Sequence, residues 1–148
     1  MKFRLILVCF SFLFVANMGY AQKKNAPKSI ISRGTDIKKY HNIDDLEGMQ
    51  KGELLTLYKE RINSIVKILP YIAFATKPGV TMNTLGIPDN NDNRKTLDAQ
   101  HEASDEFLDN TSEFQNVILP YSDTDKLIAA ILFYEETLKS LHEYSQYN

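Results

Sequence analysis

The 148-residue sequence predicts an all-α fold, a small antiparallel bundle of three long helices that follows a cleavable signal peptide. Three segments repeat apolar residues at helical spacing, and no segment shows the sustained alternation of a strand. An Ile-Leu-Pro-Tyr tetrapeptide occurs twice, and its proline can end a long helix. We therefore divide the chain into a signal peptide (1–21), a basic flexible N-terminal tail (22–43) and a helical bundle domain (44–148).

The N-terminus has the composition of an export signal. A basic start precedes an apolar run at residues 5–15, and Gly19 and Ala21 are the small residues of a cleavage site before Gln22. The run is shorter than the roughly 20 residues of a membrane span. Cleavage removes Cys9, the only cysteine, and with it disulfide, thiol-nucleophile and thiolate-metal chemistry. We expect an exported protein, periplasmic or secreted, with no transmembrane segment after cleavage.

Charge is unevenly distributed along the rest of the chain. Residues 22–41 have a balance of +5 and residues 42–148 a balance of −9. The basic stretch lacks helical periodicity and contains Pro27 and Gly34, which predicts a flexible tail. Such a tail could contact anionic lipid headgroups or the acidic body of the same protein, or it could be a solvated spacer. We expect no nucleic-acid partner.

The first helix is predicted from about Asp44 or Glu53 to Leu69, with Leu54 and Ile68 among the residues of its apolar face. Residues 71–76 could add a fourth, short helix before the chain breaks at Lys77-Pro78-Gly79.

The second helix is predicted to begin after Asp92 or Asn93 and to continue to Leu119. Its apolar side comprises Leu97, Phe107, Leu108, Thr111, Phe114 and Ile118. The third helix begins after Ser122 or Asp123 and is apolar nearly all round from residue 127 to residue 134, as expected of the most buried helix. The short connection between the two predicts that they pack as antiparallel neighbours.

Motifs of known chemistry are missing from the sequence. It has no Gly-rich phosphate loop, Ser nucleophile elbow or His-Glu-x-x-His pair, and the Asx-rich run at 89–93 lacks the glycine and glutamate of a calcium loop. Glu135, His101 and His142 could meet as a buried polar cluster, but the Glu-x-x-His motifs of di-iron bundles are absent. We expect no catalytic residue, metal or cofactor.

Two features of the sequence are candidate partner-binding sites. The second helix carries an acidic stripe, and no Lys or Arg occurs from Thr96 to Ser122, so its carboxylates repel one another unless a partner, a cation or the basic tail offsets them. The connection from residue 76 to residue 93 is long and partly apolar, typical of either a lid over the bundle or a recognition loop. The candidate residues are Lys77, Val80, Met82, Leu85 and Ile87 in the loop, and Asp98, Glu102, Asp105, Asp109 and Glu113 in the stripe.

We interpret the chain as a non-enzymatic envelope protein, an accessory or protein-binding module that docks on another protein of the cell envelope. An alternative is a small inhibitor or immunity-type protein whose acidic surface blocks an exported basic enzyme. A metal-binding bundle or an enzyme is the third hypothesis.

Overall fold

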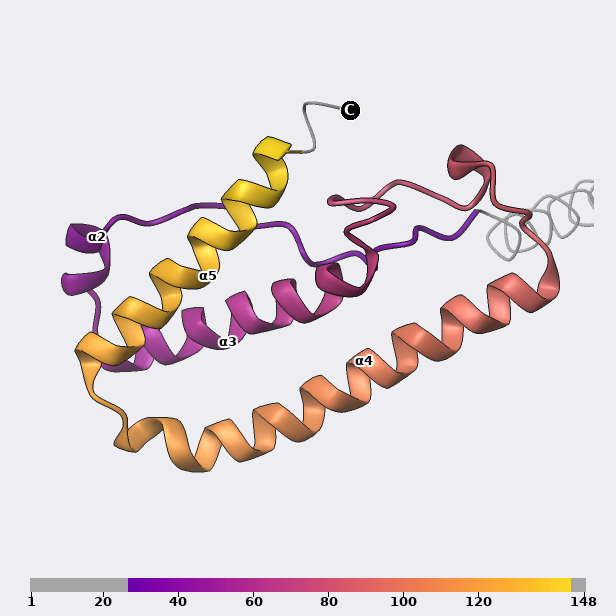
Figure 1. Ribbon diagram of the computed structural model, residues 1–148. Coiled ribbons are helices and arrows are strands. Elements are labelled where there is room, and N and C mark those ends of the chain that lie inside the picture. The colour runs from indigo at the N-terminus through magenta and orange to yellow at the C-terminus, as the bar shows by residue number, and fades with distance from the viewer. Residues whose placement is uncertain (1–26, 145–148) are drawn as a thin grey trace, which may run out of the picture.

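The computed structural model describes residues 27–144, which are mostly helical and contain no strand (Figure 1). The helices are α2 (Ile43–Glu47), α3 (Lys51–Ile68), α4 (Asn91–Ile118) and α5 (Thr124–Tyr144). Short 3-10 turns occupy Leu69–Tyr71, Asn83–Leu85 and Leu119–Tyr121. The prediction of three long helices and one short helix is confirmed, although the short helix is α2 rather than residues 71–76. The predicted signal peptide lies outside the described residues.

Local capping explains where the helices begin. The Asn42 side chain accepts a hydrogen bond of 2.8 Å from the backbone N–H of Asp45, whose carboxylate accepts one of 3.2 Å from the Asn42 backbone. This capping box starts α2. Asn90 caps α4 by accepting from the Asn93 backbone at 2.9 Å, two residues before the earliest cap expected from the sequence.

Each Ile-Leu-Pro-Tyr tetrapeptide ends a long helix in a 3-10 turn, because proline cannot donate the next helical hydrogen bond. The two tyrosines differ, however. Tyr71 is buried, whereas Tyr121 is 86% exposed, so only the first copy covers its helix end with an aromatic ring.

The three long helices do not pack side by side as a bundle with nearly parallel axes. In Figure 1, α3 and α4 run in opposite directions, while α5 rises from the end of α4 and crosses α3. The main packing of α5 is against α3, and the predicted antiparallel pairing of the second and third helices is replaced by divergence from the Ser122 connection. The reason is that the apolar residues of α5 pack against those of α2 and α3. This first apolar cluster comprises Leu46 of α2, Leu54 and Leu57 of α3, and Leu127, Ile128 and Ile131 of α5.

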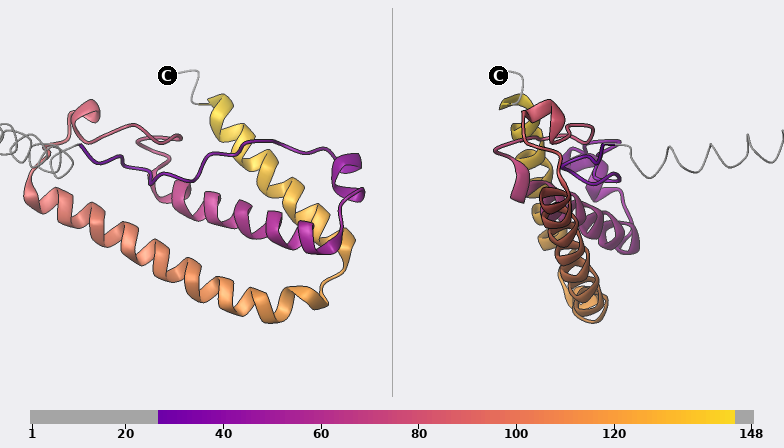
Figure 2. Two further views of the ribbon diagram at one scale, coloured as in Figure 1. Left: turned by 180° about the vertical axis from the view of Figure 1, so that it is seen from behind. Right: turned by 90° about the vertical axis from the view of Figure 1, so that its right-hand side faces the viewer.

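A second apolar cluster closes the other end of the α3–α5 interface. The segment before α2 is part of it, because Ile30 and Ile31 are buried there at 5% and 0% exposure. This extended segment runs along α3 toward α2 (Figures 1 and 2). The prediction of a flexible tail is therefore wrong for residues 27–42, whose apolar side chains lack helical spacing but still enter the core. Residues 22–26 of that tail lie outside the described residues.

The apolar side predicted for α4 is only partly correct. Leu97 and Leu108 are buried, but Phe107, Phe114 and Ile118 are 55%, 64% and 47% exposed. The residues that face α3 in their place include Ser104 and Gln115, both 8% exposed. Because α5 leaves toward α3, no helix within residues 27–144 covers the side of α4 that carries the two phenylalanines.

Candidate functional site

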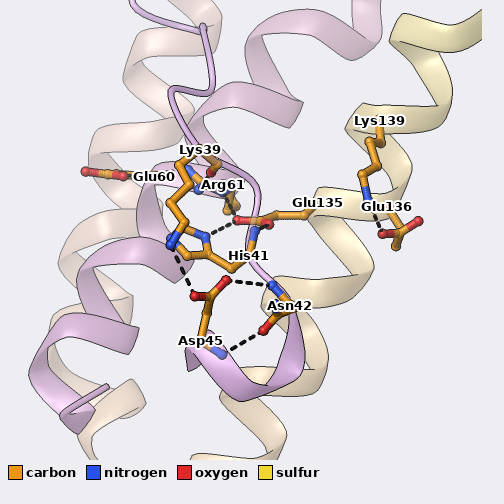
Figure 3. A network of polar contacts seen from close by, with 9 residues as sticks. All are labelled: Lys39, His41, Asn42, Asp45, Glu60, Arg61, Glu135, Glu136 and Lys139. Carbon is orange, nitrogen blue, oxygen red and sulfur yellow. Dashed lines mark hydrogen bonds and ion pairs between the residues drawn. The ribbon is translucent and has the colours of Figure 1, made fainter. Parts of the chain in front are cut away.

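A charged pair lies between the two apolar clusters, at the middle of the α3–α5 interface. Arg61 follows Leu57 by one turn on α3, and Glu135 follows Ile131 by one turn on α5. Arg61 Nε donates to Glu135 Oε1 at 2.7 Å, and the two side chains are 6% and 2% exposed (Figure 3). The ion pair thus replaces one apolar layer of the interface.

The segment before α2 completes this polar network. The backbone N–H of His41 donates to Glu135 Oε2 at 2.5 Å, and His41 Nδ1 lies 2.9 Å from Oε1. Since a carboxylate only accepts hydrogen bonds, Nδ1 carries the proton of this contact. Arg61 Nη2 donates to the Lys39 carbonyl at 2.9 Å. Three elements, α3, α5 and the extended segment, therefore meet at one carboxylate (Figure 3).

The network keeps Glu135 ionised. Burial is the largest influence and by itself raises the pKa of Glu135, but the hydrogen bonds from His41 and Arg61 together hold that pKa below its ordinary value of 4.5. Burial also raises the pKa of the neighbouring Tyr40, and the negative charge of Glu135 adds to this effect. Tyr40 Oη and His142 Nδ1 are 3.1 Å apart, within hydrogen-bond distance.

The arrangement serves to hold the fold together. Glu135 has no oxygen without a hydrogen bond from the protein, and its partners fix the extended segment against α3 and α5. The sequence left open whether Glu135, His101 and His142 meet, and in the structure they do not gather around one point. His101 Nε2 instead bonds the Ile30 carbonyl at 2.8 Å. Within residues 27–144, no group of three or more metal-ligating side chains is placed to hold an ion.

A polar cleft of about 960 Å³ adjoins the network, between residues 34–41, α3 and the C-terminal half of α4. His41 and Arg61 lie in its wall, Leu57 and Leu108 are among its apolar residues, and Asp109 of the predicted acidic stripe lines it. The cleft exists because α4 presents Thr111, Ser112 and Gln115 rather than bulky apolar residues toward α3.

The predicted recognition loop folds over the bundle. Met82 is buried, and Val80, Leu85 and Ile87 pack against the second apolar cluster. The backbone N–H of Ile30 donates to the Val80 carbonyl at 2.8 Å, next to an isolated bridge between residues 29 and 81. Of the loop candidates, only Lys77 is exposed. The apolar loop residues thus complete this chain's own core, as the lid interpretation expects.

Lysine side chains of the same chain form ion pairs with part of the acidic stripe. Asp98 forms an ion pair with Lys28 of the extended segment, and Asp105 lies 2.7 Å from Lys67 Nζ on α3. The pairing with Lys28 lowers the pKa of Asp98. Glu102 and Glu113 are exposed. Two of the five carboxylates of the stripe are therefore paired with lysines of the same chain, although all five residues are exposed.

The sequence reasoning missed an exposed apolar surface on the C-terminal half of α4. At 100° per residue its members share one side of the helix, and the 3-10 turn continues it. We name it the α4 apolar row: Phe107, Phe114, Val117, Ile118 and Tyr121, which are 47–86% exposed. Glu106 and Glu113 border this row. Neither belongs to an ion pair within the described part of the chain.

Two further residues of the network, Arg61 and His41, were also missed. The spacing of residues 54, 57, 61, 64 and 68 places Arg61 on the buried seam of α3 and could have identified it. His41 precedes the helices, and no periodic signal marks it.

Comparisons of the chain with known protein families, with curated proteins and with solved structures found no match. Among residues 27–144, none of the helices combines the length and apolar character that crossing a membrane requires.

Proposed function

We propose that the mature chain is an exported, non-enzymatic binding protein that docks a basic amphipathic helix of another envelope protein. The docking surface is the α4 apolar row together with its acidic border, Glu106 and Glu113. The observation that carries the proposal is the exposure of Phe107 and Phe114, two large aromatic side chains on a helix whose opposite flank is already packed.

The apolar row supplies the affinity in this proposal. Contiguous exposed apolar surface on a soluble domain is typical of an interaction site. Fully burying a Phe side chain is worth about 1.5–3 kcal/mol, and aromatic residues are enriched among those that dominate interface energetics. Phe107, Phe114 and Tyr121 follow one another at intervals of seven residues, which is the spacing that a partner helix laid along α4 would contact.

The acidic border supplies the specificity. No Lys or Arg occurs from Thr96 to Ser122, and the charged residues of α4 beside the row are acidic. Lys59 of α3 contacts this part of α4 at Asn116, on the opposite side of the helix from the row. A second copy of this chain would bring Glu106 and Glu113 against like charges, whereas Lys or Arg beside the apolar positions of a partner would pair with them. Charge complementarity therefore favours a basic partner over self-association.

Synthetic peptides test the binding mode directly. We expect a Leu/Lys amphipathic helix to bind the mature protein in fluorescence anisotropy, and a Leu/Glu helix of the same spacing not to bind. Phe107→Ser with Phe114→Ser should abolish binding of the Leu/Lys helix. Glu106→Lys with Glu113→Lys should weaken binding at low salt and reduce its salt dependence. The reversal of Glu47 and Glu143 to Lys is the charge-matched control, because both are exposed outside α4.

Three results would contradict the proposal. Equal binding of the Leu/Lys and Leu/Glu helices would remove the role of charge. Unchanged binding after the Phe107 and Phe114 substitutions would place the contact elsewhere. A dimer in sedimentation that Phe114→Ser disperses would show that the row is covered by a second copy instead.

The export part of the proposal has an independent measurement. The native protein recovered from the cell should begin at Gln22, which N-terminal sequencing and mass spectrometry determine. A chain that retains residues 1–21 would contradict export by cleavage. The inhibitor alternative uses the same surface, and it requires that a captured basic enzyme lose its activity in the complex.

A further inference from the structure

The polar cleft between α3 and α4 holds buried hydrogen-bonding side chains that have no partner in the described part of the chain. Ser64 of α3 and Gln115 of α4 line the cleft and are 5% and 8% exposed. Neither side chain forms a hydrogen bond with another described residue. Ser104 shows the usual arrangement, since its hydroxyl donates to the Gln100 carbonyl one turn earlier at 2.9 Å. Because buried polar groups are nearly always hydrogen-bonded, Ser64 and Gln115 require an explanation.

The unpaired groups open into the cleft. Within residues 27–144, the only side-chain N or O atom that is both fully enclosed and without a partner belongs to Tyr71, which is not part of the cleft. The Ser64 hydroxyl and the Gln115 amide therefore keep accessible surface, and for side chains so deeply buried in its wall that surface faces the cleft. Arg61 adds a donor in the same wall. Its Nε and Nη2 are bonded within the protein, whereas Nη1 lies 3.7 Å from Glu60 Oε2, beyond hydrogen-bond distance.

The charges of the lining nearly balance. The basic residues are Lys38, Lys39, Lys59 and Arg61, and the acidic residues are Asp36, Glu60 and Asp109. Glu135 in turn pairs with Arg61 from outside the lining. An ion of either sign would therefore meet repulsion, and an apolar ligand would cover Ser64 and Gln115 without replacing their water. A neutral molecule rich in hydroxyl groups avoids both costs, because a hydroxyl can donate and accept, as the Ser and Gln side chains do.

We propose that this cleft binds a neutral saccharide of about two rings. Its volume of about 960 Å³ lies at the upper end of small-molecule sites. At the roughly 30 Å³ that a water molecule occupies in the liquid, it holds about thirty non-hydrogen atoms, enough for a disaccharide. Ser64, Gln115 and Arg61 Nη1 bond the sugar hydroxyls, and Leu57 and Leu108 contact the C–H faces of the rings. The cleft shares no residue with the α4 apolar row, so this proposal is independent of docking.

Disaccharides that differ in charge test the ligand class on the mature protein. Cellobiose and N,N′-diacetylchitobiose are neutral, de-acetylated chitobiose is cationic, and cellobiouronic acid is anionic. We expect saturable binding of at least one neutral sugar, followed by NMR shifts of the Gln115 side-chain amide and of the Ser64 and Ser112 backbone amides. The charged sugars should bind about ten-fold more weakly or worse. No saturable shift with either neutral sugar would overturn the proposal, as would tighter binding of a charged sugar or of the zwitterionic dipeptide Ala-Gln.

Substitutions separate ligand binding from a structural role. Since Ser64 and Gln115 have no partner in the described part of the chain, Ser64→Ala with Gln115→Leu should leave the thermal midpoint unchanged or raise it, yet weaken the bound disaccharide by about ten-fold or more. A lowered midpoint would assign both side chains to the fold and overturn the proposal, as would unchanged affinity.

A second pair of variants tests the location. Ser112→Trp should fill the cleft and abolish binding of the disaccharide. Asn110→Trp is the matched control, because Asn110 is exposed on the same helix but outside the lining, and it should leave the affinity unchanged. Equal affinities of the two Trp variants would refute the location.

Discussion

Replacing Glu135 by glutamine removes the negative charge that Arg61 faces in the middle of the α3–α5 interface. The glutamine has nearly the same shape, so the change tests charge rather than volume. The two side chains are 2% and 6% exposed, and solvent therefore screens the loss little. Breaking one partner of a buried ion pair costs about 3–5 kcal/mol, because the other charge stays buried without compensation. That is a large part of the roughly 5–15 kcal/mol that stabilises a typical domain.

Urea unfolding at neutral pH measures this loss. We expect Glu135→Gln to lower the free energy of unfolding by about 3 kcal/mol or more. Glu136→Gln is the matched control: Glu136 is the next residue of α5, is 66% exposed and pairs only with Lys139 at 2.8 Å, so its replacement should have no measurable effect. A loss below about 1 kcal/mol for Glu135→Gln, the range of exposed pairs, would refute the reasoning.

A double variant tests whether the charges of Arg61 and Glu135 stabilise the fold through each other. Arg61→Met with Glu135→Leu removes both charges and continues the apolar layers on either side. Replacing a buried ion pair by apolar residues is often neutral or stabilising. We therefore expect the double variant to be more stable than Glu135→Leu alone. If the losses of the two single variants simply add, Arg61 and Glu135 do not interact energetically.

Four further outcomes follow from the structure. Since the folded pKa of Glu135 lies below 4.5, its contribution is present above that value and lost as the pH falls through the folded pKa; the stability difference between wild type and Glu135→Gln should narrow in acid unfolding series. Met82→Ala should cost about 2–5 kcal/mol in urea unfolding, whereas Lys77→Ala should cost less than about 0.5 kcal/mol. Ile31→Ala should cost about 2–5 kcal/mol, and wild-type stability would show that the extended segment does not support the core. Phe114→Ser should leave the thermal midpoint nearly unchanged, because the ring is 64% exposed; a large loss would mean that the ring is buried in solution.

The helices were predictable because their signals are local. Spacing of apolar residues identified the three long helices, and Pro70 and Pro120 marked two of their ends within a residue or two. Glu135, considered from the sequence as part of a possible buried polar cluster, is indeed buried at 1% exposure. These features depend on neighbours three or four positions away, which any single helix reveals in its own sequence.

The site depends on contacts between distant segments, and there the sequence reasoning was incomplete. The polar character of Glu135 was visible, but its partners come from Arg61 on α3 and from His41 before α2, 74 and 94 positions away. The basic charge of residues 22–41 suggested a solvated tail, whereas Ile30 and Ile31 are drawn into the core. Burial of these two side chains offsets part of the entropy of ordering the extended segment, and the hydrogen bonds of the segment to Glu135, Arg61 and Val80 add to the stabilisation.

What the sequence by itself determined is the helical class, the ends of α3 and α4 before the two prolines, and the acidic side of α4. Only the tertiary structure decided which side of α4 stays uncovered, because that depends on the direction in which α5 leaves the Ser122 connection. By crossing onto α3, α5 buries its own apolar face and leaves Phe107 and Phe114 exposed beside Glu106 and Glu113. A pattern of apolar residues states that a face must be buried, but whether the chain itself or a partner buries it is set by the packing of the other helices.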